Sequence, residues 1–162
     1  MKLKIYFFTG GIILFVCLMT SPVFAEKEND ARTPFLNPFL EAEHFYYSGD
    51  IEKSQYFYQD YLNGKPSRDR GNIALYRLGT IYEQSRSFVI ALRYYGLILD
   101  RSPNSLMTQN AKFGQAICFF ELEQYDQAEK LFTEIAYSHP DINKKWKARV
   151  YLGKLDQKQL DY

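Results

Sequence analysis

The sequence contains few of the residues on which catalytic centres, metal sites and disulfide frameworks depend. Its 162 residues include two cysteines, two histidines and one tryptophan, and two cysteines exclude a framework of several disulfides. An excess of charge of one sign is also lacking, because 20 Lys and Arg face 19 Asp and Glu. A basic footprint for nucleic acid is therefore not expected. Hydrophobic residues make up 46% of the chain and aromatic residues 17%, which predicts a folded domain of ordinary size.

The longest apolar run lies at the N-terminus. Two lysines precede an apolar segment over residues 5–19, and Val23-Phe24-Ala25 places residues of small or modest size before Glu26. A basic start, an apolar centre and a small-residue ending are typical of a secretory signal peptide. We expect residues 1–25 to be removed on export, which predicts a periplasmic or secreted protein. An uncleaved membrane anchor and lipidation at Cys17 are open alternatives.

Residues of like type recur every 37 positions through the rest of the chain, which indicates an internal repeat. The recurring positions hold prolines, small residues and aromatic residues. They include Pro66, Pro103 and Pro140; Ala42, Gly79, Ala116 and Gly153; Phe45, Tyr82 and Phe119; Phe39, Tyr76 and Phe113; and Tyr58, Tyr95 and Phe132. Because these series share one register, a chance match does not explain them.

Each unit of the repeat is predicted to be a pair of helices. Apolar and small residues recur within a unit at spacings of three and four, which is helical periodicity. Proline ends each unit because it cannot continue a helix. We expect a polar leader over residues 26–36 and one repeat domain over 37–160. The boundaries of its units are expected at 37–66, 67–103 and 104–140, with a capping helix over 142–160.

The pattern resembles the tetratricopeptide repeat family. Leu78-Gly79-x-x-Tyr82 and Phe88-x-x-Ala91-x-x-x-Tyr95 match its signature, and Tyr125-x-x-Ala128-x-x-x-Phe132 matches it again. The period exceeds the usual value of about 34, and the early tryptophan of the family is absent. The longer period is similar to that of bacterial envelope proteins such as the outer-membrane β-barrel assembly lipoprotein and the Tol–Pal coordinator protein. The resemblance implies an all-α fold, a right-handed α-solenoid of three helix-turn-helix repeats plus a C-terminal capping helix.

Catalytic and metal chemistry find little support in the sequence. His44 and His139 fall in different units, and no cysteine or carboxylate stands at metal-ligand spacing to either. Glycine-rich phosphate loops and nucleophile elbows are missing. Cys118 lies among apolar residues, where a cysteine usually behaves as a small hydrophobe. We therefore expect no enzyme, no metal and no cofactor.

The resemblance assigns a binding role to the first helix of each unit, which lines the concave face in the family. Carried over by register, this groove is predicted to contain aromatic residues and a few charges. Its expected residues are Phe39, Glu43, Tyr46, Tyr47, Ile73, Tyr76, Arg77, Thr80, Glu83, Asn110, Phe113, Ile117, Phe120, Lys147, Tyr151 and Lys154. One alternative is that Phe39, Tyr76 and Phe113 only pack between neighbouring first helices and add stability, and another is that Tyr46, Tyr47 and Phe120 belong to the core.

A non-catalytic protein–protein interaction module of the cell envelope is the function that these features predict. An aromatic groove suits a partner peptide or helix with apolar anchors. The partner is expected to be another protein, not nucleic acid and not a small-molecule cofactor. A self-associating scaffold of an envelope complex and, more remotely, a domain that binds cell-wall glycan are the alternatives.

Overall fold

The computed structural model describes residues 37–160 and the side chains of residues 37–158. The predicted signal peptide and leader lie outside the described residues. Seven helices make up the described part of the chain, and it contains no strand. They are α1 (Pro38–Ser48), α2 (Ile51–Asn63), α3 (Arg68–Gln84), α4 (Phe88–Arg101), α5 (Leu106–Glu121), α6 (Tyr125–Ser138) and α7 (Ile142–Leu160).

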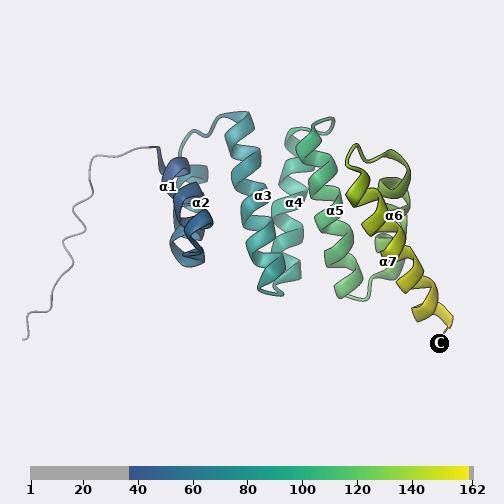
Figure 1. Ribbon diagram of the computed structural model, residues 1–162. Coiled ribbons are helices and arrows are strands. Elements are labelled where there is room, and N and C mark those ends of the chain that lie inside the picture. Colours follow the sequence, from purple (N-terminus) through teal and green to yellow (C-terminus); the bar gives the residue numbers. More distant parts are fainter. Residues whose placement is uncertain (1–36, 161–162) are drawn as a thin grey trace, which may run out of the picture. The chain divides into compact units, whose positions relative to one another are not determined.

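Each helix packs against the next one along the chain, and α3 also packs against α5 (Figure 1). The helices therefore form three consecutive pairs followed by a single helix, in which α1, α3, α5 and α7 are first helices and α2, α4 and α6 are second helices. The predicted all-α helical repeat solenoid is confirmed. No helix within residues 37–160 combines the length and the apolar character that crossing a membrane requires.

The turn between the two helices of a unit keeps one backbone conformation in all three units. Gly49, Arg86 and Glu123 are 37 residues apart and have φ angles of 86°, 61° and 58°. Each lies just beyond a first helix, where a left-handed residue lets the chain reverse direction. In the second unit Ser87 N–H donates to the Tyr82 carbonyl at 2.8 Å, as in a Schellman motif. The repeat in sequence is thus also a repeat in backbone geometry.

Aromatic pairs recur in the same register. A ring of the first helix meets a ring of the second helix edge-on or tilted in every unit. The centroids are 6.2 Å apart for Phe39–Tyr58, 5.9 Å for Tyr76–Tyr95 and 6.2 Å for Phe113–Phe132. Because such contacts add to the burial of apolar area, these pairs are the centre of each unit's core.

The small residues of the repeat lie where the helices cross. Ala42, Ala116, Ala91 and Ala128 are fully buried. At Gly79 the ring of Tyr95 occupies the place that a Cβ atom would take. Close crossing therefore depends on a small residue at this position, as the sequence predicts.

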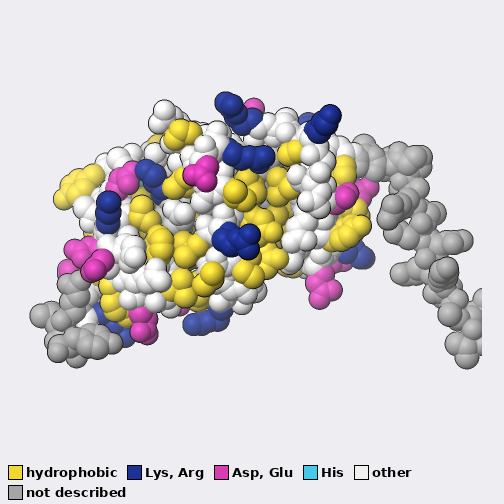
Figure 2. All heavy atoms as spheres, turned by 180° about the vertical axis from the view of Figure 1, so that it is seen from behind, with side chains coloured by type: hydrophobic (Ala, Val, Ile, Leu, Met, Phe, Trp, Pro, Cys, Tyr) yellow, Lys and Arg dark blue, Asp and Glu magenta, His cyan; other side chains and the backbone are white. Residues whose placement is uncertain are grey.

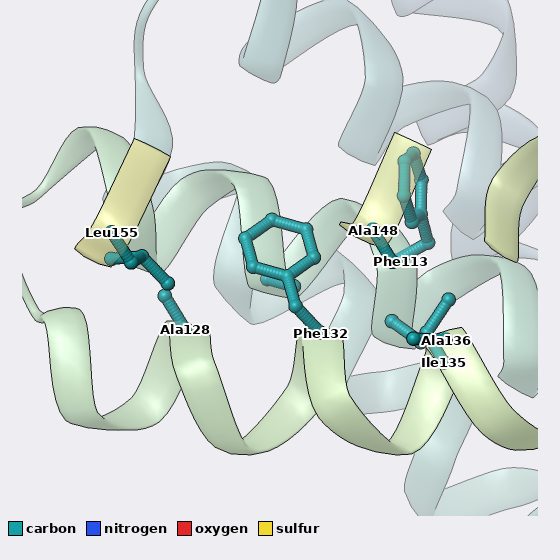
Figure 3. Close-up of a cluster of buried hydrophobic side chains, with 8 residues drawn as sticks. Phe113, Ala128, Phe132, Ile135, Ala136, Ala148 and Leu155 are labelled. Atoms are coloured by element: carbon teal, nitrogen blue, oxygen red, sulfur yellow. The ribbon is translucent and has the colours of Figure 1, made fainter. Parts of the chain in front are cut away.

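The last helix covers the end of the stack with one of its faces. Ala148 and Leu155 of α7 are buried against α6, and Tyr151 stacks on Phe132 with centroids 4.6 Å apart. In Figure 3 the side chains of Ala128, Phe132 and Ile135 follow one another along α6 within this cluster. The opposite face of α7 carries exposed apolar side chains, whereas the outer face of a terminal cap is usually polar.

Candidate functional site

An ion pair joins the first helices of units one and two. Arg77 Nε of α3 lies 3.2 Å from Glu43 Oε1 of α1, and both side chains are 22% exposed. Arg77 Nη2 also donates to the Tyr47 hydroxyl at 2.7 Å. The guanidinium lies 4.3 Å from the ring centroid of Tyr46. Arg77 therefore holds two tyrosine rings and a carboxylate in a fixed arrangement at the surface.

Glu43 has a second partner from below the surface. Tyr58 of α2 donates a hydrogen bond from its hydroxyl to Glu43 Oε1. Burial raises the pKa of Tyr58 well above its ordinary value, and the Glu43 carboxylate adds to the rise. The hydroxyl is therefore a permanent donor, which fixes the carboxylate between Tyr58 and Arg77.

A similar arrangement lies one unit further along. The Tyr95 hydroxyl of α4 donates to Glu83 Oε2 of α3 at 2.7 Å, and Thr80 Oγ1 lies 3.5 Å from the same hydroxyl. Burial raises the pKa of Glu83, and the neighbouring Glu121 carboxylate raises it further, although the hydrogen bond from Tyr95 acts in the opposite direction. Burial also raises the pKa of Tyr76, whose ring lies against that of Tyr95. Glu83 is thus a carboxylate whose charge is poorly solvated.

The row continues onto α5 and α7. Phe120 of α5 contacts Tyr151 of α7, with centroids 5.2 Å apart. Lys154 Nζ lies 4.8 Å from the Tyr151 ring centroid. We call the whole row the first-helix face. It consists of Glu43, Tyr46, Tyr47, Tyr76, Arg77, Thr80, Glu83, Phe120, Tyr151 and Lys154.

Two residues that the sequence placed in this row, Phe39 and Phe113, lie elsewhere. Phe39 and Phe113 are 7% and 9% exposed and belong to the core, so they pack inside the units and present no ring to a partner. Ile73 and Ile117 are half-buried against core clusters, as Tyr46 and Phe120 are, so their place in the groove stays a prediction. Asn110 accepts a hydrogen bond from Lys144. Hydrophobic periodicity marks both core and surface aromatics of a first helix, which is why the sequence did not separate them.

Lys147 is the remaining member of the expected set. Its side chain is exposed on α7, and no hydrogen bond, ion pair or ring contact within the described residues holds it in place.

The hydroxyls of Tyr58 and Tyr95 donate to carboxylates of the first-helix face, a contact that sequence reasoning missed because their rings were expected only to fill space. A signal for them exists in the repeat itself. Units one and two have tyrosine at this position and unit three has Phe132, but the carboxylate partners Glu43 and Glu83 stand at different positions of the repeat. Because a buried tyrosine hydroxyl needs a partner, tyrosine at this position predicts a hydrogen bond, while the repeat does not identify its partner.

A pocket of about 300 Å³ lies away from the first-helix face. Its lining comes from α2, α3 and α4 and consists of Gln59, Leu62, Asn63, Leu75, Tyr94, Leu97 and Arg101. Figure 2 shows hydrophobic side chains in broad patches over the face opposite to that of Figure 1, with charged side chains between and around them. The pocket could not be predicted from the sequence, because its walls come from helices of different units.

Within the described residues, two side chains that could be reactive, Cys118 and His139, are buried. Cys118 is fully buried, and burial raises the pKa of its thiol to about 12. His139 is fully buried, and burial together with Lys144 lowers its pKa. Within the described residues, no group of three or more His, Cys, Asp or Glu could hold a metal ion.

Comparison with known families bears on the third unit. Residues 110–141, which cover most of α5 and all of α6, match the family model described as Tetratricopeptide repeat. No curated protein matches the chain. The match supports the resemblance to tetratricopeptide repeats in this helix pair, and repeats of this kind generally mediate protein–protein interaction.

Proposed function

We propose that residues 37–160 form a non-catalytic protein-binding module of the cell envelope, which docks a segment of a partner protein on the first-helix face. The observation that carries this proposal is the fixed position of Arg77 between Glu43, Tyr46 and Tyr47. Tyrosine and arginine are enriched among residues that dominate binding energy. A surface that is already ordered before binding loses less conformational entropy when a partner docks.

The chemistry of the face indicates what kind of segment it takes. Half-buried rings at Tyr46, Tyr76 and Phe120 offer apolar contact. Glu83 is a carboxylate whose desolvation a cation would offset. We therefore expect a partner segment with apolar anchors and a lysine or arginine directed at Glu83.

Placement in the envelope is supported by the signal-peptide pattern of residues 1–25 alone. A fractionation experiment tests it directly. The protein should be recovered from the periplasm or the medium with its N-terminus at Glu26, and recovery of the intact N-terminus in the membrane would indicate an anchor.

The binding test is a pull-down from envelope extract with the protein lacking residues 1–25, followed by mass spectrometry. Tyr47→Glu is the disrupting variant, because Tyr47 is 73% exposed and its substitution should leave the fold intact. Tyr76→Glu is less suitable, since it would place a charge against the buried Tyr95 ring. Tyr137→Glu is the matched control, with an equally exposed tyrosine on α6 at 78%.

One protein enriched by the wild type and by Tyr137→Glu, and lost with Tyr47→Glu, would support the proposal and identify the partner. Equal enrichment with all three proteins would place the interface outside the first-helix face.

A further inference from the structure

The outward face of α7 carries a stripe of exposed apolar side chains. Ile142, Trp146 and Val150 follow one another at spacings of four and are 58%, 59% and 58% exposed. On the opposite face of the helix, Ala148 and Leu155 are buried against α6. A first helix that ends a stack usually turns a polar face to water, so this stripe needs an explanation.

The register of the repeat shows what the stripe corresponds to. On α5, the residues 37 positions earlier than this part of α7 face α6. Lys112 Nζ forms an ion pair with Glu134 Oε1 of α6 at 2.6 Å, and the ring of Phe113 meets that of Phe132. Ala116 is fully buried in the same cluster.

The second unit uses the same positions. On α3, Asn72 Nδ2 donates to Ser102 Oγ at 2.8 Å, just beyond the end of α4. Tyr76 packs on Tyr95, and Gly79 makes room for that ring. Counted over α3 and α5 together, four positions of the repeat on a first helix thus contact the second helix of the same unit.

In α7 these four positions are Trp146, Arg149, Val150 and Gly153, and within the described residues no helix covers them. A Cβ atom on Gly153 would meet no atom within 4 Å. Arg149, in register with Lys112, lies over the Trp146 ring with its guanidinium 5.0 Å from the centroid. It forms no ion pair in the described part of the chain, whereas Lys112 pairs with Glu134. The face is therefore shaped like the docking side of α5, without its second helix.

Charge around the stripe selects among occupants. By helical geometry Arg149 and Lys145 border it on one side, and Lys147 and Lys154 border it on the other. Asp156 is the one carboxylate of α7. Two such faces in contact would bring many like charges together, so a second copy of this helix is disfavoured. An acidic surface is complementary to it.

We propose that the stripe of α7 docks an acidic amphipathic helix of a partner protein, in the position that α4 and α6 hold on α3 and α5. The occupant places a small residue over Gly153, an apolar or aromatic side chain over Val150, and a carboxylate against Arg149. This is helix-in-groove recognition in which the template is the chain's own α5–α6 junction. It is independent of the first-helix face.

The sequence of α6 supplies the probe for a test. A peptide of residues 123–140, held helical by a lactam between Asp126 and Lys130, retains Glu134 and Phe132 in their native relation. Both linked side chains are exposed in the structure. Trp146 is the one tryptophan of the chain, so its fluorescence reports contact at the stripe and nowhere else.

Addition of the peptide to the purified protein should shift the emission of Trp146 to shorter wavelength in a saturable manner. Arg149→Glu should weaken binding roughly tenfold or more, and so should the Glu134→Lys peptide, because each places like charges together. The two changes combined should restore binding. Tyr47→Glu on the first-helix face should leave the titration unchanged, which separates this surface from the one proposed above.

Circular dichroism checks that each variant is folded, and Val150→Asp gives a second disrupting change at an exposed position. Absence of a saturable shift up to millimolar peptide would overturn the proposal, as would a shift that is indifferent to Arg149→Glu. If the emission of Trp146 shifts with rising protein concentration in the absence of peptide, the occupant of the stripe is a second copy of the protein. If phosphatidylglycerol vesicles shift the emission of Trp146 and the peptide does not, the stripe binds a membrane surface.

Discussion

The ring of Tyr95 occupies the space that a side chain at position 79 would need, so α3 and α4 approach closely only because residue 79 is glycine. Gly153 has the same place in the repeat, two units later, but faces open space. The two glycines therefore make opposite predictions. Gly79→Ala should destabilise the fold by about 1–3 kcal/mol, because the added methyl group displaces a fully buried ring.

Gly153→Ala is the matched control in the same register. It should stabilise the fold by about 0.5–1 kcal/mol, since alanine restricts the unfolded chain and the helix has room for it. Urea unfolding followed by circular dichroism measures both. Equal effects of the two substitutions would contradict the packing seen at Gly79.

The ion pair of Glu43 and Arg77 gives a second prediction. Arg77→Met should cost about 1–3 kcal/mol, because it leaves a largely buried carboxylate without its cation. Adding Glu43→Gln to Arg77→Met should recover part of the loss, since the amide is neutral and still accepts the hydrogen bond of Tyr58. A double-mutant cycle by urea unfolding measures the coupling. Simple additivity of the two changes would show that the pair contributes nothing.

The fold could be predicted from the sequence because its repeat specifies the packing. Positions 42, 79 and 116 are small, and positions 58, 95 and 132 are large rings. These two facts are enough to place the helix crossings and the ring pairs that the structure contains. Stacked units repeat one local solution, so a pattern that is local in sequence fixes contacts throughout the domain.

The surface was harder to predict. Tyr46 and Tyr47 follow Phe39 by seven and eight positions, so the three residues lie on one side of the helix, and Phe113 has the same register as Phe39. Phe39 and Phe113 are nevertheless core, whereas Tyr47 is exposed. Periodicity identifies the apolar side of a helix and not which of its residues another helix covers. The apolar stripe of α7 was missed for the same reason, because its pattern equals that of a covered first helix.

The left-handed turn residues lead to a third prediction. Glu123 has φ of 58°, and its register equivalent in the first unit is Gly49. A left-handed conformation strains a residue with a Cβ atom, so Glu123→Gly should stabilise the protein by about 0.5–1 kcal/mol. Glu123→Ala keeps the Cβ atom and should bring no such gain. Thermal unfolding of the two variants measures the difference in stability. A gain in stability with Glu123→Ala as well would assign the effect to the loss of the glutamate side chain.

The raised pKa of Glu83 gives a prediction about pH. Burial and the Glu121 carboxylate favour the protonated form of Glu83. The pKa of Glu83 in the folded state therefore lies above its usual value of 4.5. The stability associated with that proton is fully present below pH 4.5 and is lost as pH rises through the folded-state pKa. Glu83→Gln removes the charge, and its amide oxygen can still accept the hydrogen bond from Tyr95.

Glu83→Gln should therefore be more stable than the wild type near neutral pH, and the difference should shrink as pH falls toward 4.5. Urea unfolding across this pH range measures it. Glu52→Gln, at an exposed position of α2, is the control and should give curves parallel to the wild type. If Glu83→Gln also weakens partner capture while it raises stability, the desolvated carboxylate is retained for binding at a cost in stability. A loss of stability at neutral pH would instead show that the Tyr95–Glu83 hydrogen bond outweighs the cost of burial.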